Sequence, residues 1–135
     1  MQYITGIHAL NLPCSLQTNG DWHRSALQWE ELKTRNSEGS LFGDYGIEYC
    51  PSVPESKGVY AVANHIRALL DLLELENYSI AQGMNKNFIG NDSYNNEIFS
   101  KVVLMRNLPH WREIDEFMGR EYYGKWLDFK EVAGV

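Results

Sequence analysis

The chain has few of the residues that build metal or disulfide frameworks. Its 135 residues include only two cysteines, Cys14 and Cys50, which are far apart and form no CxxC pair. Structural zinc sites and dithiol redox pairs need closely spaced cysteines. We therefore expect two reduced, partly buried thiols. The alternative is a single disulfide in an exported protein.

Long apolar runs are also missing. No stretch reaches the roughly 18 apolar residues that a membrane-spanning helix requires. No basic flank precedes the apolar patches of residues 1–13, as it would in a signal peptide. The sequence thus predicts a cytoplasmic protein that does not cross a membrane.

Basic residues are the scarcer of the two charge types. The chain has 12 Lys and Arg against 18 Asp and Glu, a net charge of −6, and its basic residues do not cluster. Because each phosphate contact needs a Lys or Arg, direct nucleic-acid binding is not expected. The acidic balance favours a protein partner with a basic surface, and a homo-oligomer is compatible with the sequence.

The common nucleotide, hydrolase and metalloprotease motifs are absent. There is no GxxxxGK[ST], GxGxxG, GxSxG or HExxH. Gly39, Gly43 and Gly46 form only GxxxGxxG, without the strand-then-helix context of a phosphate loop. We therefore expect no cofactor and no bound metal.

The hydrophobic pattern predicts an α+β fold in one domain over residues 1–135. A strand is expected over Tyr3–Leu12 and a second after Gly46, which gives a small N-terminal β-sheet or hairpin. It would pack on a C-terminal helical bundle of about four helices. The expected helices cover residues 22–33 (capped by Asp21), 59–73, 79–84, 93–105 (capped by Asp92 or Ser93), a segment opened by Pro109, and 121–132.

The helix predicted at 59–73 has the clearest amphipathic spacing. Its apolar positions lie on one face, and Arg67 and Asp71 lie on the other as an ordinary solvated i,i+4 ion pair. His65 falls at the border of the apolar face, where we expect a half-buried imidazole hydrogen-bonded to a neighbour. His8, in the first strand, is expected to be a hydrogen-bonded interior histidine.

Two glycine-containing segments, NGDWH (19–23) and FGDYGIE (42–48), are the densest combination of polar and aromatic residues. Glycines beside acids and aromatic rings suit a pocket. The catalytic candidates are Asp21, His23, Asp44 and Glu48: Asp21 and His23 would pair as base and orienter, or bind a metal with Asp44 or Glu48. In the plainer and favoured interpretation Asp21 caps a helix, Trp22 packs in the core and His23 lies on the surface.

A second candidate surface is the C-terminal run of aromatic and acidic residues between 111 and 129. Aromatic anchors with polar rims carry much of the energy of protein interfaces. In the favoured interpretation the aromatic residues are core and the acids a solvated face. The predicted binding residues are Trp22, Tyr45, Trp111, Asp115, Tyr122 and Trp126.

Several stretches look familiar: ITGIHALNLPC, NGDWH, FGDYGIE, VANHIRALLDLL, AQGMN and PHWREIDEFMGREY. Together they resemble a family of short bacterial proteins of uncharacterised function, over nearly the whole chain. The resemblance carries no activity and no catalytic residues. It implies an association with toxin-antitoxin or mobile-element loci, and so a partner-binding role.

The first hypothesis from the sequence is a non-enzymatic binding or regulatory protein, antitoxin-like, that applies an acidic and aromatic surface to a protein partner. The alternative is a small enzyme or ligand-binding domain with a pocket between the GDWH and FGDYGIE segments.

Overall fold

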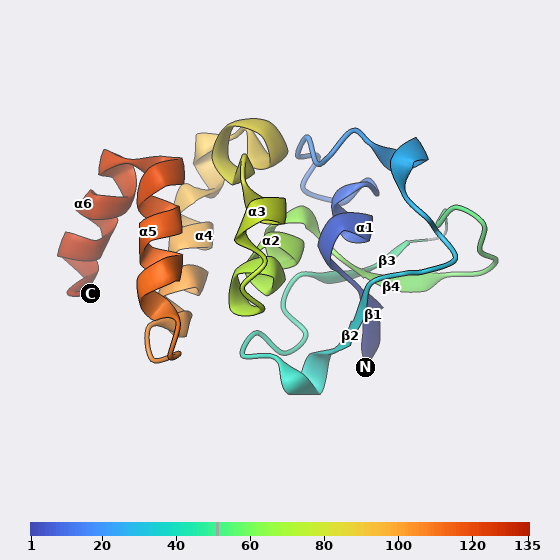
Figure 1. Ribbon diagram of the computed structural model, residues 1–135, viewed down its shortest axis with the longest axis horizontal. Coiled ribbons are helices and arrows are strands. Elements are labelled where there is room, and N and C mark those ends of the chain that lie inside the picture. Colours follow the sequence, from blue (N-terminus) through green and yellow to red (C-terminus); the bar gives the residue numbers. More distant parts are fainter. Residues whose placement is uncertain (51) are drawn as a thin grey trace.

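Four short strands form one mixed sheet at one end of an elongated molecule (Figure 1). The computed structural model describes residues 1–50 and 52–135. The sheet order is β2-β1-β4-β3, with β1 antiparallel to β2 and parallel to β4, and β3 antiparallel to β4. The strands are β1 (Gln2–Ile4), β2 (Thr34–Asn36), β3 (Ile47–Cys50) and β4 (Tyr60–Ala63).

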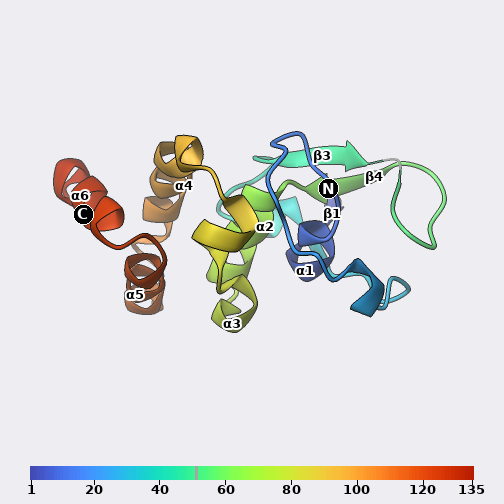
Figure 2. The same cartoon turned by 90° about the horizontal axis from the view of Figure 1, so that it is seen from above.

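Helices fill the rest of the chain and dominate its C-terminal half. Figure 2 shows α1 and α2 against one face of the sheet, with α4, α5 and α6 beyond them toward the opposite end. The α-helices are α1 (Gly6–Leu10), α2 (His65–Glu74), α3 (Tyr78–Ala81), α4 (Asn95–Val102), α5 (Trp111–Tyr122) and α6 (Gly124–Ala133). Short turns of 3-10 helix are η1 (Arg24–Ala26), η2 (Ser37–Gly39), η4 (Asp92–Tyr94) and η5 (Val103–Met105), and η3 (Met84–Ile89) is a π-helix. The predicted α+β class is confirmed. None of the helices described is both long enough and apolar enough to cross a membrane.

The central helix α2 begins later than the sequence pattern predicted. Residues Tyr60–Ala63 form β4 instead, because their backbone pairs with β1 on one side and β3 on the other. Asn64 then caps α2, its side-chain oxygen accepting a hydrogen bond from the Arg67 amide at 2.8 Å. From this start, Ile66, Leu69, Leu70 and Leu73 are fully buried in the core.

Two of the N-terminal expectations are wrong. The strand predicted over Tyr3–Leu12 ends at Ile4, and α1 follows because its Ala9 and Leu10 are buried in the core. The helix predicted over residues 22–33 is reduced to the single turn η1. Asp21 caps no helix: its amide donates to the Leu10 carbonyl at 2.8 Å, which joins this loop to α1.

The C-terminal helices lie near their predicted positions with shifted boundaries. The helix expected over 79–84 ends at Ala81, before Gly83 at φ +96° and the π-helix η3, and Glu121, the expected start of the last helix, belongs to the last turn of α5. The helix expected to end near Met105 is the continuous run η4, α4 and η5, and the side chain that caps it is that of Asn91, which accepts from the Ser93 amide. His8, although helical, is the expected interior histidine, 4% exposed, with its ring between the Gln28 carbonyl and the Lys33 amide. Both cysteines are free thiols.

The ion pair of Arg67 and Asp71 is buried, contrary to the expected solvated pair. Their side chains are 0% and 1% exposed, with Arg67 Nε 3.0 Å from Asp71 Oδ1. The other carboxylate oxygen of Asp71 accepts hydrogen bonds from the hydroxyls of Tyr3 (2.6 Å) and Thr5 (2.7 Å). Arg35 lies 2.9 Å from the same carboxylate, so Asp71 joins β1 and β2 to α2.

The Arg67 guanidinium has partners on every side. It donates to the carbonyls of Gly43 (2.7 Å) and Tyr45 (2.6 Å) and to the Tyr3 hydroxyl (2.8 Å). Gly46, at φ +73°, passes so close that a Cβ there would lie 2.7 Å from the Arg67 Cβ. The loop between β2 and β3 is therefore fixed to α2 by hydrogen bonds and by a position that only glycine fills well.

Removal of the buried cation should be far more damaging than removal of an exposed one. We expect Arg67→Ala to lower the free energy of unfolding by about 3 to 5 kcal/mol, because it leaves Asp71 buried with an incomplete set of partners. Arg112→Ala is the matched control, since Arg112 forms an i,i+4 pair with Glu116 in which its side chain is 88% exposed. That variant should lose less than about 0.5 kcal/mol. Urea unfolding followed by circular dichroism measures both, and equal losses would contradict the assigned role.

Candidate functional site

The loop between α1 and η1 encloses His65, the first residue of α2. The imidazole is buried, with 2% of the residue exposed. Its Nε2 lies 2.7 Å from the Leu12 carbonyl and its Nδ1 lies 2.6 Å from the Thr18 hydroxyl. A carbonyl only accepts, so these partners assign the ring hydrogen to Nε2. In the neutral ring, Nδ1 therefore accepts a hydrogen bond from Thr18.

The Cys14 thiol continues this chain of hydrogen bonds. Its sulfur is half-buried and lies 3.7 Å from the Thr18 hydroxyl oxygen. Since Thr18 gives its hydrogen to His65, its oxygen is the acceptor for the thiol hydrogen. The three side chains make a path along which a proton can pass from Cys14 through Thr18 to His65, as activation of a thiol nucleophile requires.

The electrostatics of the pair favour the charged forms. Burial raises the pKa of the Cys14 thiol, but its interaction with the nearby His65 imidazole and the hydrogen bond with Thr18 outweigh burial and lower that pKa below its ordinary value. Burial lowers the pKa of His65, yet the interactions with Cys14, the Leu12 carbonyl and Glu48 raise it overall. Both shifts promote a thiolate beside an imidazolium.

Gly20 of the NGDWH segment holds the imidazole in place. Its φ is +67°, and a Cβ there would lie 2.8 Å from His65 Cε1 and 2.4 Å from the Leu10 carbonyl oxygen. The Gly20 amide also donates to the Phe88 carbonyl at 2.8 Å. The backbone of this turn therefore packs directly on the ring, which no other residue type allows without displacement.

Two pockets adjoin this chain of hydrogen bonds. One, of about 370 Å³, lies between the Pro13–Ser15 segment and β3, and its lining includes Cys14 and Glu48. Glu48 accepts hydrogen bonds from the amide (3.0 Å) and the hydroxyl of Ser15. The other, of about 330 Å³, is lined in part by Thr18, Asp21 and His65. Cys14 and His65 thus belong to the walls of neighbouring pockets.

The four predicted catalytic residues are dispersed around this region. The structure brings Asp21 and His23 into contact through the Asp21 carboxylate and His23 Nδ1. Asp21 and Glu48 line different pockets, and Asp44 is exposed on the loop before β3. Across residues 1–50 and 52–135, no three His, Cys, Asp or Glu side chains are grouped to hold a metal ion.

The predicted binding residues divide into surface and core. Trp22 is 80% exposed, so it does not pack in the core. Tyr45 is half-buried and its hydroxyl donates to Glu97.

The other four predicted binding residues belong to α5 and α6. Tyr122 and Trp126 are 2% and 0% exposed and pack edge-on against Phe99. Trp111 is half-buried, and Asp115 accepts from the Trp126 indole at 2.8 Å and from Lys130 at 2.8 Å. Tyr122 and Trp126 are therefore core residues that hold α5 and α6 against α4 and present no surface to a partner.

The sequence did not predict that Cys14, Thr18 and His65 lie together. Thr18 and His65 are 47 positions apart, so no local spacing reveals their contact. One feature of the sequence could have indicated this site: His65 directly follows Asn64, the residue that caps the most amphipathic helix, α2. His65 was expected at a border and half-buried, yet it is buried and bonded on both ring nitrogens.

Comparison with known proteins adds no assignment. The chain matches no protein-family model, no curated protein and no solved structure. Function must therefore be argued from the site itself.

Alkylation by iodoacetamide tests whether His65 activates Cys14. In the folded protein we expect Cys14 to react faster than the buried Cys50. In His65→Gln its pH–rate midpoint should move upward, because the imidazolium no longer stabilises the thiolate. Mass spectrometry of the modified peptides across pH 5 to 10 measures both rates, and a Cys50→Ser background isolates Cys14. A midpoint unchanged by His65→Gln would contradict the pairing.

Proposed function

We propose that the chain is a small thiol-dependent acyl-transfer enzyme in which Cys14 is the nucleophile and His65, acting through Thr18, is its base. The supporting observation is the hydrogen-bonded path from a half-buried thiol at a pocket wall to a buried imidazole. This proposal develops the sequence-based alternative of a small enzyme with a pocket between the GDWH and FGDYGIE segments, but with different catalytic residues.

The reaction needs two proton transfers, one from Cys14 to His65 and one from His65 to the leaving group. Cys14 transfers its proton through Thr18 to His65, and the thiolate attacks the carbonyl carbon of an ester or thioester. A carbon–sulfur bond forms as the bond to the leaving oxygen or sulfur breaks, and His65 returns the proton to the leaving group by way of Thr18. Water, or a second nucleophile, then cleaves the acylated cysteine and restores the thiol.

The pocket favours a small, uncharged acyl group. Its volume of about 370 Å³ is at the lower end of the range for ligand sites. Val62 and Ala63 contribute apolar wall, while the Glu48 carboxylate, held by Ser15, gives the pocket a negative side. An anionic substrate would meet this carboxylate, so neutral acyl donors are the better fit.

Hydrolysis of p-nitrophenyl acetate tests the proposal directly. We expect a burst of p-nitrophenolate and an acetyl group on Cys14, detectable by mass spectrometry of the trapped protein. Cys14→Ser should abolish the burst, and His65→Gln should slow acylation roughly 10²- to 10⁴-fold, the usual contribution of a positioned base.

Two matched variants separate chemistry from folding. Thr18→Ser keeps the hydroxyl and should retain the burst, whereas the similarly shaped Thr18→Val should lose it. Cys50→Ser removes the other thiol of the same pocket wall and should remain active. Acetylation that persists in Cys14→Ser, or equal activity in Thr18→Val and Thr18→Ser, would refute the proposed relay.

A second candidate function, binding of a basic protein partner in an antitoxin-like role, is favoured by Trp22. A tryptophan that is 80% exposed is a strong anchor for an interface. It borders a shallow surface pocket of about 530 Å³ together with Leu27, Trp29 and Pro54. The net charge of −6 would favour a basic partner.

Co-purification from the native host tests this second function. We expect a protein partner to be retained at low salt and lost from Trp22→Ala. Tyr49→Ala removes another exposed aromatic ring, 70% exposed, and should retain the partner. Recovery of the wild-type chain alone at both low and high salt would count against a partner.

A further inference from the structure

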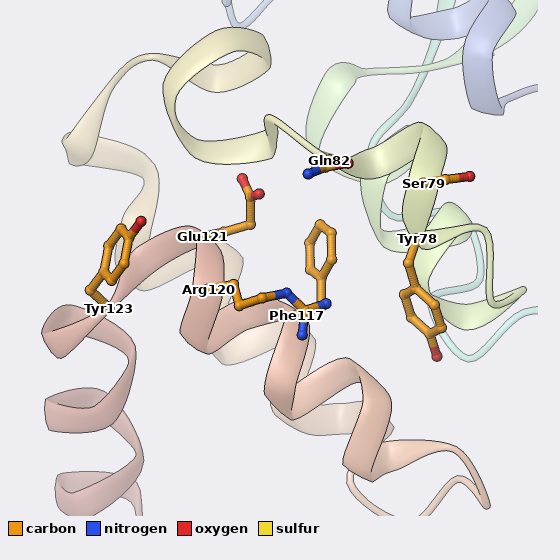
Figure 3. A pocket seen from close by; sticks show the side chains of 7 residues that line it. All are labelled: Tyr78, Ser79, Gln82, Phe117, Arg120, Glu121 and Tyr123. Carbon is orange, nitrogen blue, oxygen red and sulfur yellow. The ribbon is translucent and has the colours of Figure 1, made fainter.

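A groove separate from the Cys14 region lies between α3, η3 and α5. Figure 3 shows one part of it, a pocket of about 530 Å³ between α3 and the end of α5. A neighbouring pocket of about 490 Å³ extends to Lys86 on η3 and shares five lining residues with the first: Ser79, Gln82, Arg120, Glu121 and Tyr123. Neither pocket shares a lining residue with those beside Cys14 and His65.

The groove carries two exposed cations, Arg120 and Lys86. Arg120 and Lys86 form neither an ion pair nor a side-chain hydrogen bond among the residues that the structure describes. Glu121 also lines both pockets and keeps its negative charge, but its carboxylate is held at the start of η3, where it accepts from the amides of Gly83 (3.2 Å) and Asn85 (3.0 Å). Two cations against this one carboxylate leave the groove with a net positive charge, which favours an anion in an otherwise acidic protein.

Three aromatic residues line the groove, and Tyr123 is the one whose ring is largely exposed. Phe117 is 2% exposed, and its ring packs against that of Tyr78 with centroids 6.1 Å apart. Figure 3 shows the Arg120 side chain extended from α5 beside Phe117, with Tyr78 and Tyr123 at opposite ends of the pocket. A guanidinium next to aromatic rings binds a carboxylate or phosphate through its planar donors while the rings contact a flat, apolar group.

Tyr123 contributes a backbone strain that is concentrated at this groove. It joins α5 to α6 with φ +52° and ψ −131°, a conformation that is strained for a bulky L-residue. Hydrogen bonds maintain it: the Tyr123 amide donates to Gly119 at 2.9 Å, and its carbonyl accepts from Trp126 at 3.1 Å. The result is a ring that is 63% exposed at the rim of the pocket. Strain of this kind clusters at ligand sites.

We propose that this groove binds a small organic anion that combines a phosphate or carboxylate with a flat apolar ring. The anionic group lies beside Arg120 and Lys86, and the ring packs on the exposed ring of Tyr123, which lines both pockets. The site is independent of the proposed thiol chemistry, because the two regions share no residue.

Phenyl phosphate is the probe, titrated by isothermal calorimetry against the wild-type chain. We expect it to bind more tightly than either inorganic phosphate, which lacks the ring, or phenol, which lacks the charge. Arg120→Ala should weaken binding roughly 10- to 100-fold, the range for loss of a hydrogen bond to a charged group. Tyr123→Gly should weaken it by a smaller factor and raise the unfolding midpoint, since glycine relieves the strained backbone.

Lys57→Ala is the matched control. Lys57 is another exposed cation, outside the groove, and its removal should leave binding unchanged. Equal affinity of the wild type and Arg120→Ala would overturn the site. An equal loss in Lys57→Ala would reduce it to non-specific charge attraction, and phosphate binding as tightly as phenyl phosphate would overturn the role of the rings. Arg120 is exposed, so the unfolding midpoint of Arg120→Ala should match that of the wild type.

Discussion

The buried ion pair of Arg67 and Asp71 is the interaction on which the N-terminal half depends. Strands β1 and β2 and the loop before β3 each place a hydrogen-bonding group on it: the hydroxyls of Tyr3 and Thr5, the Arg35 guanidinium, and the carbonyls of residues 43 and 45. A charge deprived of partners in the interior is strongly destabilising. These segments therefore cannot shift on α2 without leaving a buried charge incompletely bonded, and this restricts the small sheet to one position against the helix.

The same end of α2 positions the candidate site. His65 precedes Arg67 by two residues, and side chains so spaced point to different sides of a helix. Arg67 therefore faces the sheet and the loop before β3, while His65 faces the loop that carries Cys14 and Thr18. Two glycines, Gly20 and Gly46, let these loops approach the start of the helix closely. The ion-pair network and the imidazole site are thus built on one rigid turn, which would keep the proton path from Cys14 to His65 in register.

The two proposed ligand sites differ in charge as well as in place. The pocket beside Cys14 has the Glu48 carboxylate in its wall and suits a neutral group, whereas in the groove between α3 and α5 the two cations Arg120 and Lys86 outnumber the Glu121 carboxylate and suit an anion. The aromatic residues of the C-terminal helices serve mainly as core: Tyr122 and Trp126 pack around Phe99. Trp22 is the predicted binding residue that has the exposure of an interface anchor.

The sequence by itself determined the α+β class and the helical C-terminal half, because amphipathic spacing over several turns reflects burial directly. It also indicated the interior position of His8, from the apolar character of its neighbours, although the segment is a helix and not the predicted strand. It also identified NGDWH and FGDYGIE as unusual segments. It did not show why: Gly20 and Gly46 serve close approach to α2, and Asp21 caps no helix. Only the tertiary structure decided that Tyr60–Ala63 is a strand, that Arg67 and Asp71 are buried, and that Cys14, Thr18 and His65 meet. The physical reason is that pairing partners and burial of charge come from segments distant in the chain, and local periodicity carries no record of them.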